Sequence, residues 1–162
     1  MPGSPNVIAA RSYAQSLSHS GDHWRISYEA TIAAGASHYL GFTSPVNVMV
    51  LLSSYRTGAD KMRAYLFENL TYSGGTTRAA FAKNRQQIKA AQSVWTIGVT
   101  ATPPAPQTGG VLFGLKGGGP ASFEENYILK KSTPYVLQII NDANSQSDVA
   151  FALFDFTEYD LT

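Results

Sequence analysis

The side chains that most often carry catalysis are few in this sequence and poorly spaced for it. The chain has three histidines and no cysteine, so thiolate catalysis, disulfides and sulfur-bound zinc are excluded. His19 and His23 are four residues apart, but Gly21 between them disfavours the helix that would place both rings on one face. A zinc site also needs a third ligand and a water position, and Asp22 is the only carboxylate nearby. We therefore predict no metal and no cofactor.

Patterns for nucleophilic, carboxylate-pair and phosphate chemistry are also missing from the sequence. No serine lies in a Gly-x-Ser-x-Gly turn after a strand. Asp155, Glu158 and Asp160 lie near the C-terminus without the facing geometry of a sugar-hydrolysing pair, and we expect them to be solvated. The Gly-rich run 116–120 follows its lysine, which is the wrong order for a phosphate loop. We interpret His38 as a strand or interface histidine, and the sequence predicts no enzyme activity.

Length and charge narrow the class of protein further. The 162 residues suit one domain, and 12 Lys and Arg against 11 Asp and Glu give a net charge of +1. This balance lacks the basic excess of a nucleic-acid binder, and no apolar run is long enough to span a bilayer. We therefore predict neither a nucleic-acid nor a membrane partner. Only 14% of residues are charged, against about 25% in ordinary domains, which favours a surface partly covered by a partner.

Strand patterns fill the chain after residue 23. Residues 24–32 alternate apolar and polar side chains, which is typical of a half-buried antiparallel strand. Residues 46–54 and 149–159 are apolar on both faces, which predicts burial by the second sheet or by a neighbouring chain. The alternation slips between Leu153 and Phe154, which predicts a β-bulge or burial of this strand on both sides. The other predicted strands are 38–42, 62–68, 94–100, 111–115, 126–130 and 135–141.

These eight or nine short strands, with no helix long enough for a βαβ unit, predict an all-β fold. We expect an antiparallel two-sheet sandwich, a jelly roll of about eight strands covering residues 24–162. Residues 1–23 are rich in Ser, Ala, Gly and Pro and predict an extended N-terminal arm. This arm is either a frayed terminus or a segment that orders against a neighbouring subunit. Residues 78–92, here called the basic loop, form either one short helix or, as we favour because strands flank them, an irregular crossover loop. Their four cations and no acid favour contact with an acidic protein partner.

A series of short motifs follows in a recognisable order. The motifs are A-G-A-S-H-Y-L-G-F-T-S-P at 34–45 with Gly35, Tyr39, Thr43 and Pro45, then Leu66-Phe67-Glu68, Gly74-Gly75-Thr76, Asn84-Arg85, the strand 135–141 and the aromatic strand 149–159. Over residues 24–159 this order resembles the capsid decoration, or cement, proteins of tailed bacteriophages. Gln86 and Gln87 depart from that group, which often continues with a second Asn, so the basic loop is specialised here.

The resemblance implies a non-catalytic jelly-roll subunit that acts as a homotrimer. It would be synthesised in the bacterial host cytoplasm and assembled onto the outer surface of the virion capsid, where it bridges and stabilises major capsid proteins. We predict the trimer interface on the two strands that are apolar on both faces, at Val46, Val48, Val50, Leu52, Phe151, Leu153, Phe154 and Phe156. We predict the capsid contact on the arm and the basic loop, at Ile8, Tyr13, Leu17, Phe81, Asn84 and Arg85.

Three other functions stay open at this point. A carbohydrate-binding jelly roll of a phage fibre or tail would stack Trp24, Tyr72 or Trp95 on sugars. A cupin-type enzyme would need histidines that converge inside the barrel, yet two of the three lie in the arm. A head-to-tail connector component would differ from a decoration protein in its copy number per particle.

Overall fold

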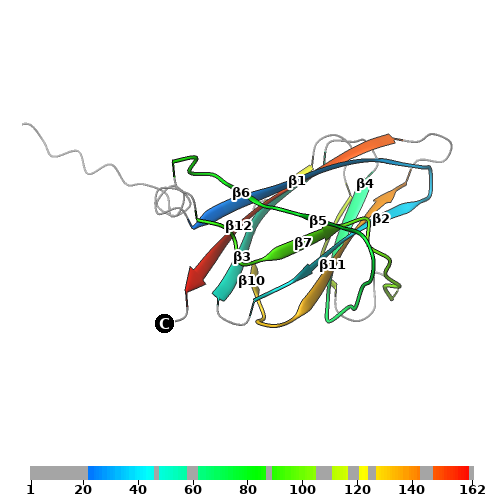
Figure 1. Ribbon diagram of the computed structural model, residues 1–162. Helices are drawn as coiled ribbons and strands as arrows, with labels where there is room; N and C mark the ends of the chain where they lie inside the picture. Colours follow the sequence, from blue (N-terminus) through cyan, green and yellow to red (C-terminus); the bar gives the residue numbers. More distant parts are fainter. Residues whose placement is uncertain are drawn as a thin grey trace, which may run out of the picture.

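The protein is an all-β sandwich of two antiparallel sheets, as predicted. The computed structural model describes residues 22–45, 48–57, 62–86, 89–104, 111–116, 121–123, 127–142 and 148–160. The strands are β1 (His23–Ile32), β2 (Ser37–Thr43), β3 (Val48–Thr57), β4 (Met62–Glu68), β5 (Thr76–Arg78), β6 (Phe81–Ala82), β7 (Val94–Ile97), β8 (Val111–Lys116), β9 (Ala121–Phe123), β10 (Tyr127–Leu129), β11 (Pro134–Asn141) and β12 (Asp148–Asp160) (Figure 1). Of the predicted arm, only Asp22 and His23 are described, so the arm prediction for residues 1–21 lies outside the described residues.

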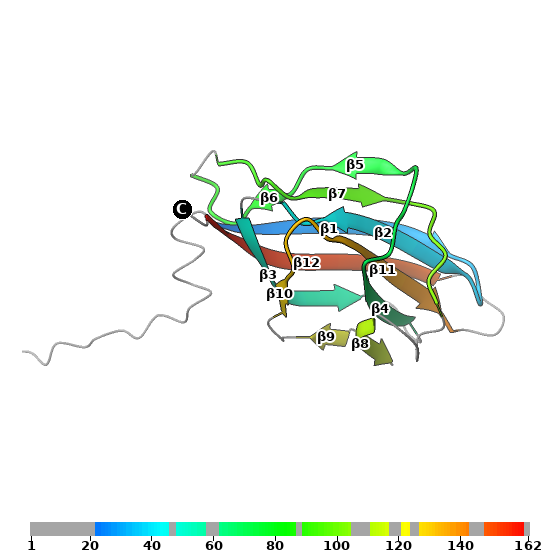
Figure 2. The same ribbon diagram turned by 90° about the horizontal axis from the view of Figure 1, so that it is seen from below.

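The strand pairing confirms the jelly roll. One sheet has the order β10-β3-β12-β1-β6, with β9 also on β3, and the other has the order β5-β7-β2-β11-β4-β8. The pairs are nested along the chain, because β1 pairs with β12, β2 with β11, β3 with β10 and β4 with β8. One long antiparallel hairpin that rolls up, so that successive pairs fall in alternate sheets, is a jelly roll. The strands β5, β6 and β7 are an insertion between β4 and β8 that extends both sheets along one side (Figure 2).

Aromatic rings fill the space between the two sheets. The alternation of β1 is confirmed, since Trp24 is 0% exposed and its inward neighbours on the strand are buried or partly buried. Trp24 stacks on Phe156 at 6.0 Å between ring centroids, and Phe42 stacks on Trp95 at 4.7 Å. Trp95 also meets Phe156 at 5.8 Å, which links one sheet to the other. Each such aromatic pair adds about 0.5–1.5 kcal/mol to the burial of its area.

The position of Phe156 corrects one predicted interface residue. Its side chain is 0% exposed inside the sandwich, so it has no surface with which to contact a neighbouring subunit. The register between β12 and β3 shifts between Asp155 and Phe156, two residues later than the sequence pattern indicated, and the extra residue is Ser53 of β3, so the irregularity is not a bulge of β12 itself. For the other predicted trimer residues, Val46 lies outside the described residues, and no side-chain environment is described for Val48, Val50, Leu52, Phe151, Leu153 and Phe154.

A buried asparagine fixes the turn between β1 and β2. The Asn141 side-chain amide donates to the carbonyl of Ile32 at 2.9 Å, and its backbone N–H donates to Ala36 at 3.0 Å. The N–H of Gly35 donates in return to the carbonyl of Asn141 at 2.9 Å. Gly35 has a φ of +70°, which a residue with a side chain rarely adopts. The turn is therefore bonded to the end of β11 and closes this end of the sandwich.

Candidate functional site

The basic loop begins by crossing the open side of the sandwich. β5 pairs with β7 at the edge of one sheet, and β6 pairs with β1 at the edge of the other. The crossing segment, residues 76–82, thus joins the two sheets over their shared side (Figure 1). The prediction of an irregular loop in place of a helix is confirmed for the described part of 78–92, which holds only short strands, turns and bends.

Asp155 of β12 anchors the start of the loop. Its carboxylate is held by Arg25, whose Nε and Nη2 donate at 2.6 and 2.8 Å, and by Lys83 Nζ at 3.1 Å. The residue is only 7% exposed. Burial alone would raise the pKa of Asp155, but the hydrogen bonds and charges of Arg25 and Lys83 outweigh it and lower the pKa to about 2. Asp155 is therefore ionised at neutral pH and bonds the loop to β1 and β12.

Two more acids hold the end of the loop. Glu158 is 2% exposed and accepts the backbone N–H groups of Gln92 at 2.8 Å and Ser93 at 2.7 Å, together with the Ser93 hydroxyl. Lys89 Nζ donates to Asp22 at 2.7 Å. The expectation that the C-terminal acids are solvated is thus wrong for Asp155 and Glu158. Strand pairing explains this, because β12 is a central strand of its sheet and its buried acids must find hydrogen-bond donors.

The anchored loop leaves one aromatic ring and two guanidinium groups on the surface. Phe81 is 55% exposed, and Arg78 and Arg85 are exposed with no carboxylate partner among the described residues. Asn84 is half-buried, and its side-chain oxygen accepts the Gln86 N–H at 3.1 Å, which shapes the turn. Phe81, Asn84 and Arg85 all lie in the described part of the loop, and their contact with a capsid stays a prediction. The other predicted capsid contacts, Ile8, Tyr13 and Leu17, lie outside the described residues.

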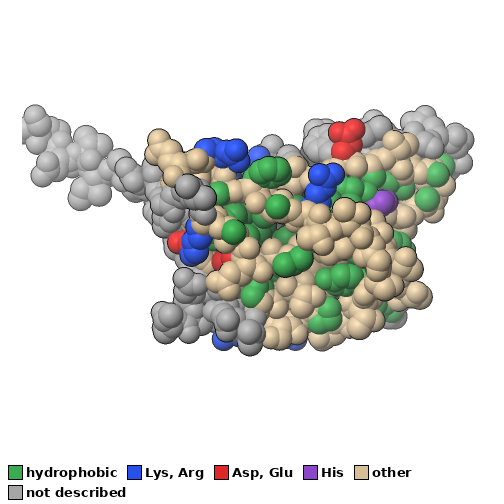
Figure 3. All heavy atoms as spheres, viewed as in Figure 1, with side chains coloured by type: hydrophobic (Ala, Val, Ile, Leu, Met, Phe, Trp, Pro, Cys, Tyr) green, Lys and Arg blue, Asp and Glu red, His purple; other side chains and the backbone are tan. Residues whose placement is uncertain are grey.

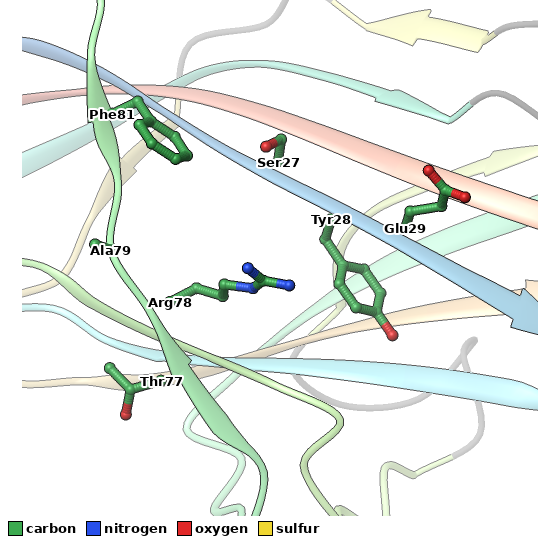
Figure 4. A pocket seen from close by; sticks show the side chains of 7 residues that line it. All are labelled: Ser27, Tyr28, Glu29, Thr77, Arg78, Ala79 and Phe81. Carbon is green, nitrogen blue, oxygen red and sulfur yellow. The ribbon is translucent and has the colours of Figure 1, made fainter.

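A groove separates the crossing segment from β1. Its volume is about 670 Å³, and it is lined by Ser27, Tyr28, Glu29, Thr77, Arg78, Ala79 and Phe81. Figure 4 shows the Arg78 side chain reaching from the crossing segment toward β1, with the Tyr28 ring on the same side of β1, while Ser27 and Glu29 point to the other side of the strand. In the space-filling view of this face, hydrophobic and basic side chains lie next to one another (Figure 3). The groove was not foreseen from the sequence.

The titratable pair beside the groove is not tuned for proton transfer. Tyr28 hydrogen-bonds His38 Nε2, and the two rings stack at 5.0 Å. Burial raises the pKa of Tyr28 to about 12, against a smaller lowering by the Arg78 charge, and burial lowers the pKa of His38. The phenol thus stays protonated and the imidazole neutral at pH 7, which fits a bonded strand histidine better than a general base. Among the described residues no three His, Asp or Glu side chains are grouped to hold a metal ion.

Two of the three aromatic residues proposed for sugar stacking are buried. Trp24 and Trp95 form part of the core, so that part of the carbohydrate-binding alternative is wrong. The Tyr72 ring lies against Gly41, where an added Cβ would be 2.5 Å from it, and its hydroxyl is 3.0 Å from Thr43 Oγ1. One face of that ring is therefore covered by the protein itself.

Comparisons with protein-family models, curated proteins and solved structures found no match for this chain. Within the part of the chain that the structure describes, no helix is long and apolar enough to cross a bilayer. The function must therefore be argued from the fold and from the anchored basic loop.

The anchoring acids were missed because they act across the sheet. Once the first and last strands of a jelly roll are paired, Arg25 and Asp155 fall directly opposite each other. Opposite charges at such a position stabilise an antiparallel pair. The predicted jelly roll already pairs its first strand with its last, so the Arg25–Asp155 contact could have been found from the sequence if the register of that pair had been known.

Proposed function

We propose that the protein is a structural virion protein that decorates and stabilises a tailed-phage capsid. It binds as a homotrimer to major capsid proteins on the outer shell. The observation that carries the proposal is the basic loop, which Asp22, Asp155 and Glu158 hold in place while Phe81 and Arg85 stay on the surface. The order of motifs that resembles decoration proteins and the jelly-roll topology agree with it.

A loop that is already ordered suits adhesion. Ordering side chains and loops on binding costs affinity, and the acid contacts remove part of that cost beforehand. Aromatic and arginine side chains are enriched at protein interfaces, so Phe81 and Arg85 are suited to contact a partner. Lys83 and Lys89 are already paired with acids of this chain and are less available for such a contact. A trimer presents three such loops, so modest contacts act together through a high effective concentration.

The oligomeric state gives the first test. A trimer of the 17.4 kDa chain has a mass of about 52 kDa by light scattering. A monomer at micromolar concentration would contradict the proposal.

Capsid binding gives the second test. The protein is added to capsids of the encoding phage from which it has been stripped, and Phe81→Ala is compared with Val94→Ala, a control that truncates an equally exposed apolar side chain (53% against 55%) outside the loop. We expect at least a tenfold loss of affinity for Phe81→Ala, since a truncated interface aromatic commonly costs about 2 kcal/mol, and near-normal binding for the control.

Deletion of residues 1–21, which leaves β1 complete, should also weaken capsid binding and leave the trimer folded. Equal binding by Phe81→Ala and wild type would refute the role of the loop.

A further inference from the structure

β1 has an open edge beyond its first three residues. It pairs with β12 along its whole length, but on its other side β6 reaches only Trp24 and Arg25. The carbonyl of His23 points to the β6 side, because it accepts the Lys83 N–H at 2.9 Å. In a strand, alternate residues direct their backbone groups to the same side. The N–H and C=O groups of the later residues with this parity therefore face the open edge.

Those residues are Ser27, Glu29 and Thr31, and they have no backbone partner on that side among the described residues. The edge opens because the crossing segment turns away from β1 to join β7 in the other sheet. The groove occupies the gap left by this divergence. Unpaired donors and acceptors of an edge strand are a template for another strand.

The side chains at the groove define what that strand must carry. Arg78 reaches into it and has no carboxylate partner among the described residues, whereas Lys83 and Lys89 of the same loop are both bonded to acids. An acidic side chain that faces inward beside Tyr28 would meet the Arg78 guanidinium. On the outer face the strand would lie beside Glu29, which favours a basic or hydroxyl side chain there.

We propose that this groove receives an extended, acid-bearing segment of the capsid protein, which adds to the sheet as a strand beside β1. The inference rests on the proposed function and names the part of the partner that the protein recognises. The arm of this chain or of a neighbouring copy is a poorer occupant, because residues 1–21 contain no Asp or Glu to meet Arg78. Backbone hydrogen bonds to β1 supply affinity, and the Arg78 contact supplies the register.

The experiment uses the full chain and stripped capsids of the encoding phage. Glu29→Pro removes a backbone donor that faces the open edge and bonds nothing within the described sheet, and proline is tolerated on such edges. Arg78→Glu reverses the charge in the groove, and Lys131→Glu is its control, since it makes the same charge change at an exposed turn residue. We expect at least a tenfold loss of capsid affinity for Glu29→Pro and for Arg78→Glu, and less than twofold for the control. Should Glu29→Pro not fold, the exposed Arg78 variant carries the test.

Amide hydrogen exchange locates the contact. In the free protein the amides of Ser27, Glu29 and Thr31 should exchange much faster than those of Ile26 and Tyr28, and they should slow on capsid binding. If wild-type protein binds capsids but both groove variants bind within twofold of it, the inference is wrong and the proposed function stands. If wild-type protein does not bind capsids, the proposed function itself fails. Protection of the three amides in the free protein that disappears when residues 1–21 are deleted would show that the arm fills the groove, and would overturn the inference.

Discussion

Replacing Asp155 by asparagine tests whether the basic loop is held by charge. A pKa of about 2 against an ordinary 3.8 corresponds to about 2–3 kcal/mol of folding free energy at neutral pH. Arg25, its main partner, has a side chain that is 43% exposed, so solvent screens part of this interaction. We therefore expect Asp155→Asn to lower the free energy of unfolding by about 1.5–2 kcal/mol at pH 7. For a domain of this size that is a fall in Tm of about 4–7 °C.

The pH dependence of the stability difference between wild type and Asp155→Asn separates an effect of charge from an effect of packing. The pKa of Asp155 is lower in the folded than in the unfolded state, so its contribution is complete above the unfolded value of 3.8 and is lost as the pH falls through about 2. The difference in stability between wild type and Asp155→Asn should thus be constant from pH 7 to pH 5, fall to about half at pH 3 and to about a sixth at pH 2.

Urea unfolding of both proteins at pH 7, 5 and 3, followed by tryptophan fluorescence, measures this difference. Asp22→Asn is the control, because Asp22 bonds a lysine from the same loop but is a partly exposed surface pair, and it should cost less than about 0.5 kcal/mol. A stability difference between wild type and Asp155→Asn that stays the same at pH 3 as at pH 7 would refute the reasoning, since the loss would then come from packing and not from charge.

Further substitutions test the packing around the loop and the turns, each by chemical unfolding. Gly75→Ala should cost about 2–3 kcal/mol, because φ is +85° and the new Cβ would lie 2.7 Å from a backbone carbonyl oxygen, whereas Gly74→Ala, at φ +67° with open space around it, should cost only about 1 kcal/mol. Gly41→Ala should cost about 1–3 kcal/mol by displacing the Tyr72 ring, and adding Tyr72→Ser should recover part of this loss in a double-mutant cycle. Glu158→Gln should cost about 2–3 kcal/mol, because one of the oxygens that accept buried N–H groups becomes a donor; a loss below 0.5 kcal/mol would contradict its anchoring role.

Local patterns in the sequence predict much of this fold. The alternation from Trp24 to Ile32 identifies both the strand and its buried face. Side chains of a strand alternate between its two faces, so when one face is covered the apolar set must lie on that face. The predicted range 62–68 agrees with β4 at both ends. The short β9 was not predicted, because three residues are too few for a periodic pattern and depend on pairing with β3.

The candidate site needed the long-range pairing of strands, which no local pattern contains. From the sequence, all four cations of the basic loop could contact an acidic partner. In the structure two of them are bonded within the chain, Lys83 to Asp155 of β12 and Lys89 to Asp22, the residue before β1. Only the closure of the first strand on the last brings those acids beneath the loop. The crossing segment pairs with β1 only at β6 and with β7 of the other sheet at β5, so β1 beyond Arg25 keeps β12 on one side and has no strand on its other side among the described residues. Lys83 follows β6, the part of the crossing segment that pairs with β1, so a substitution that detaches Lys83 from Asp155 should loosen both the loop and the pairing of β6 with β1.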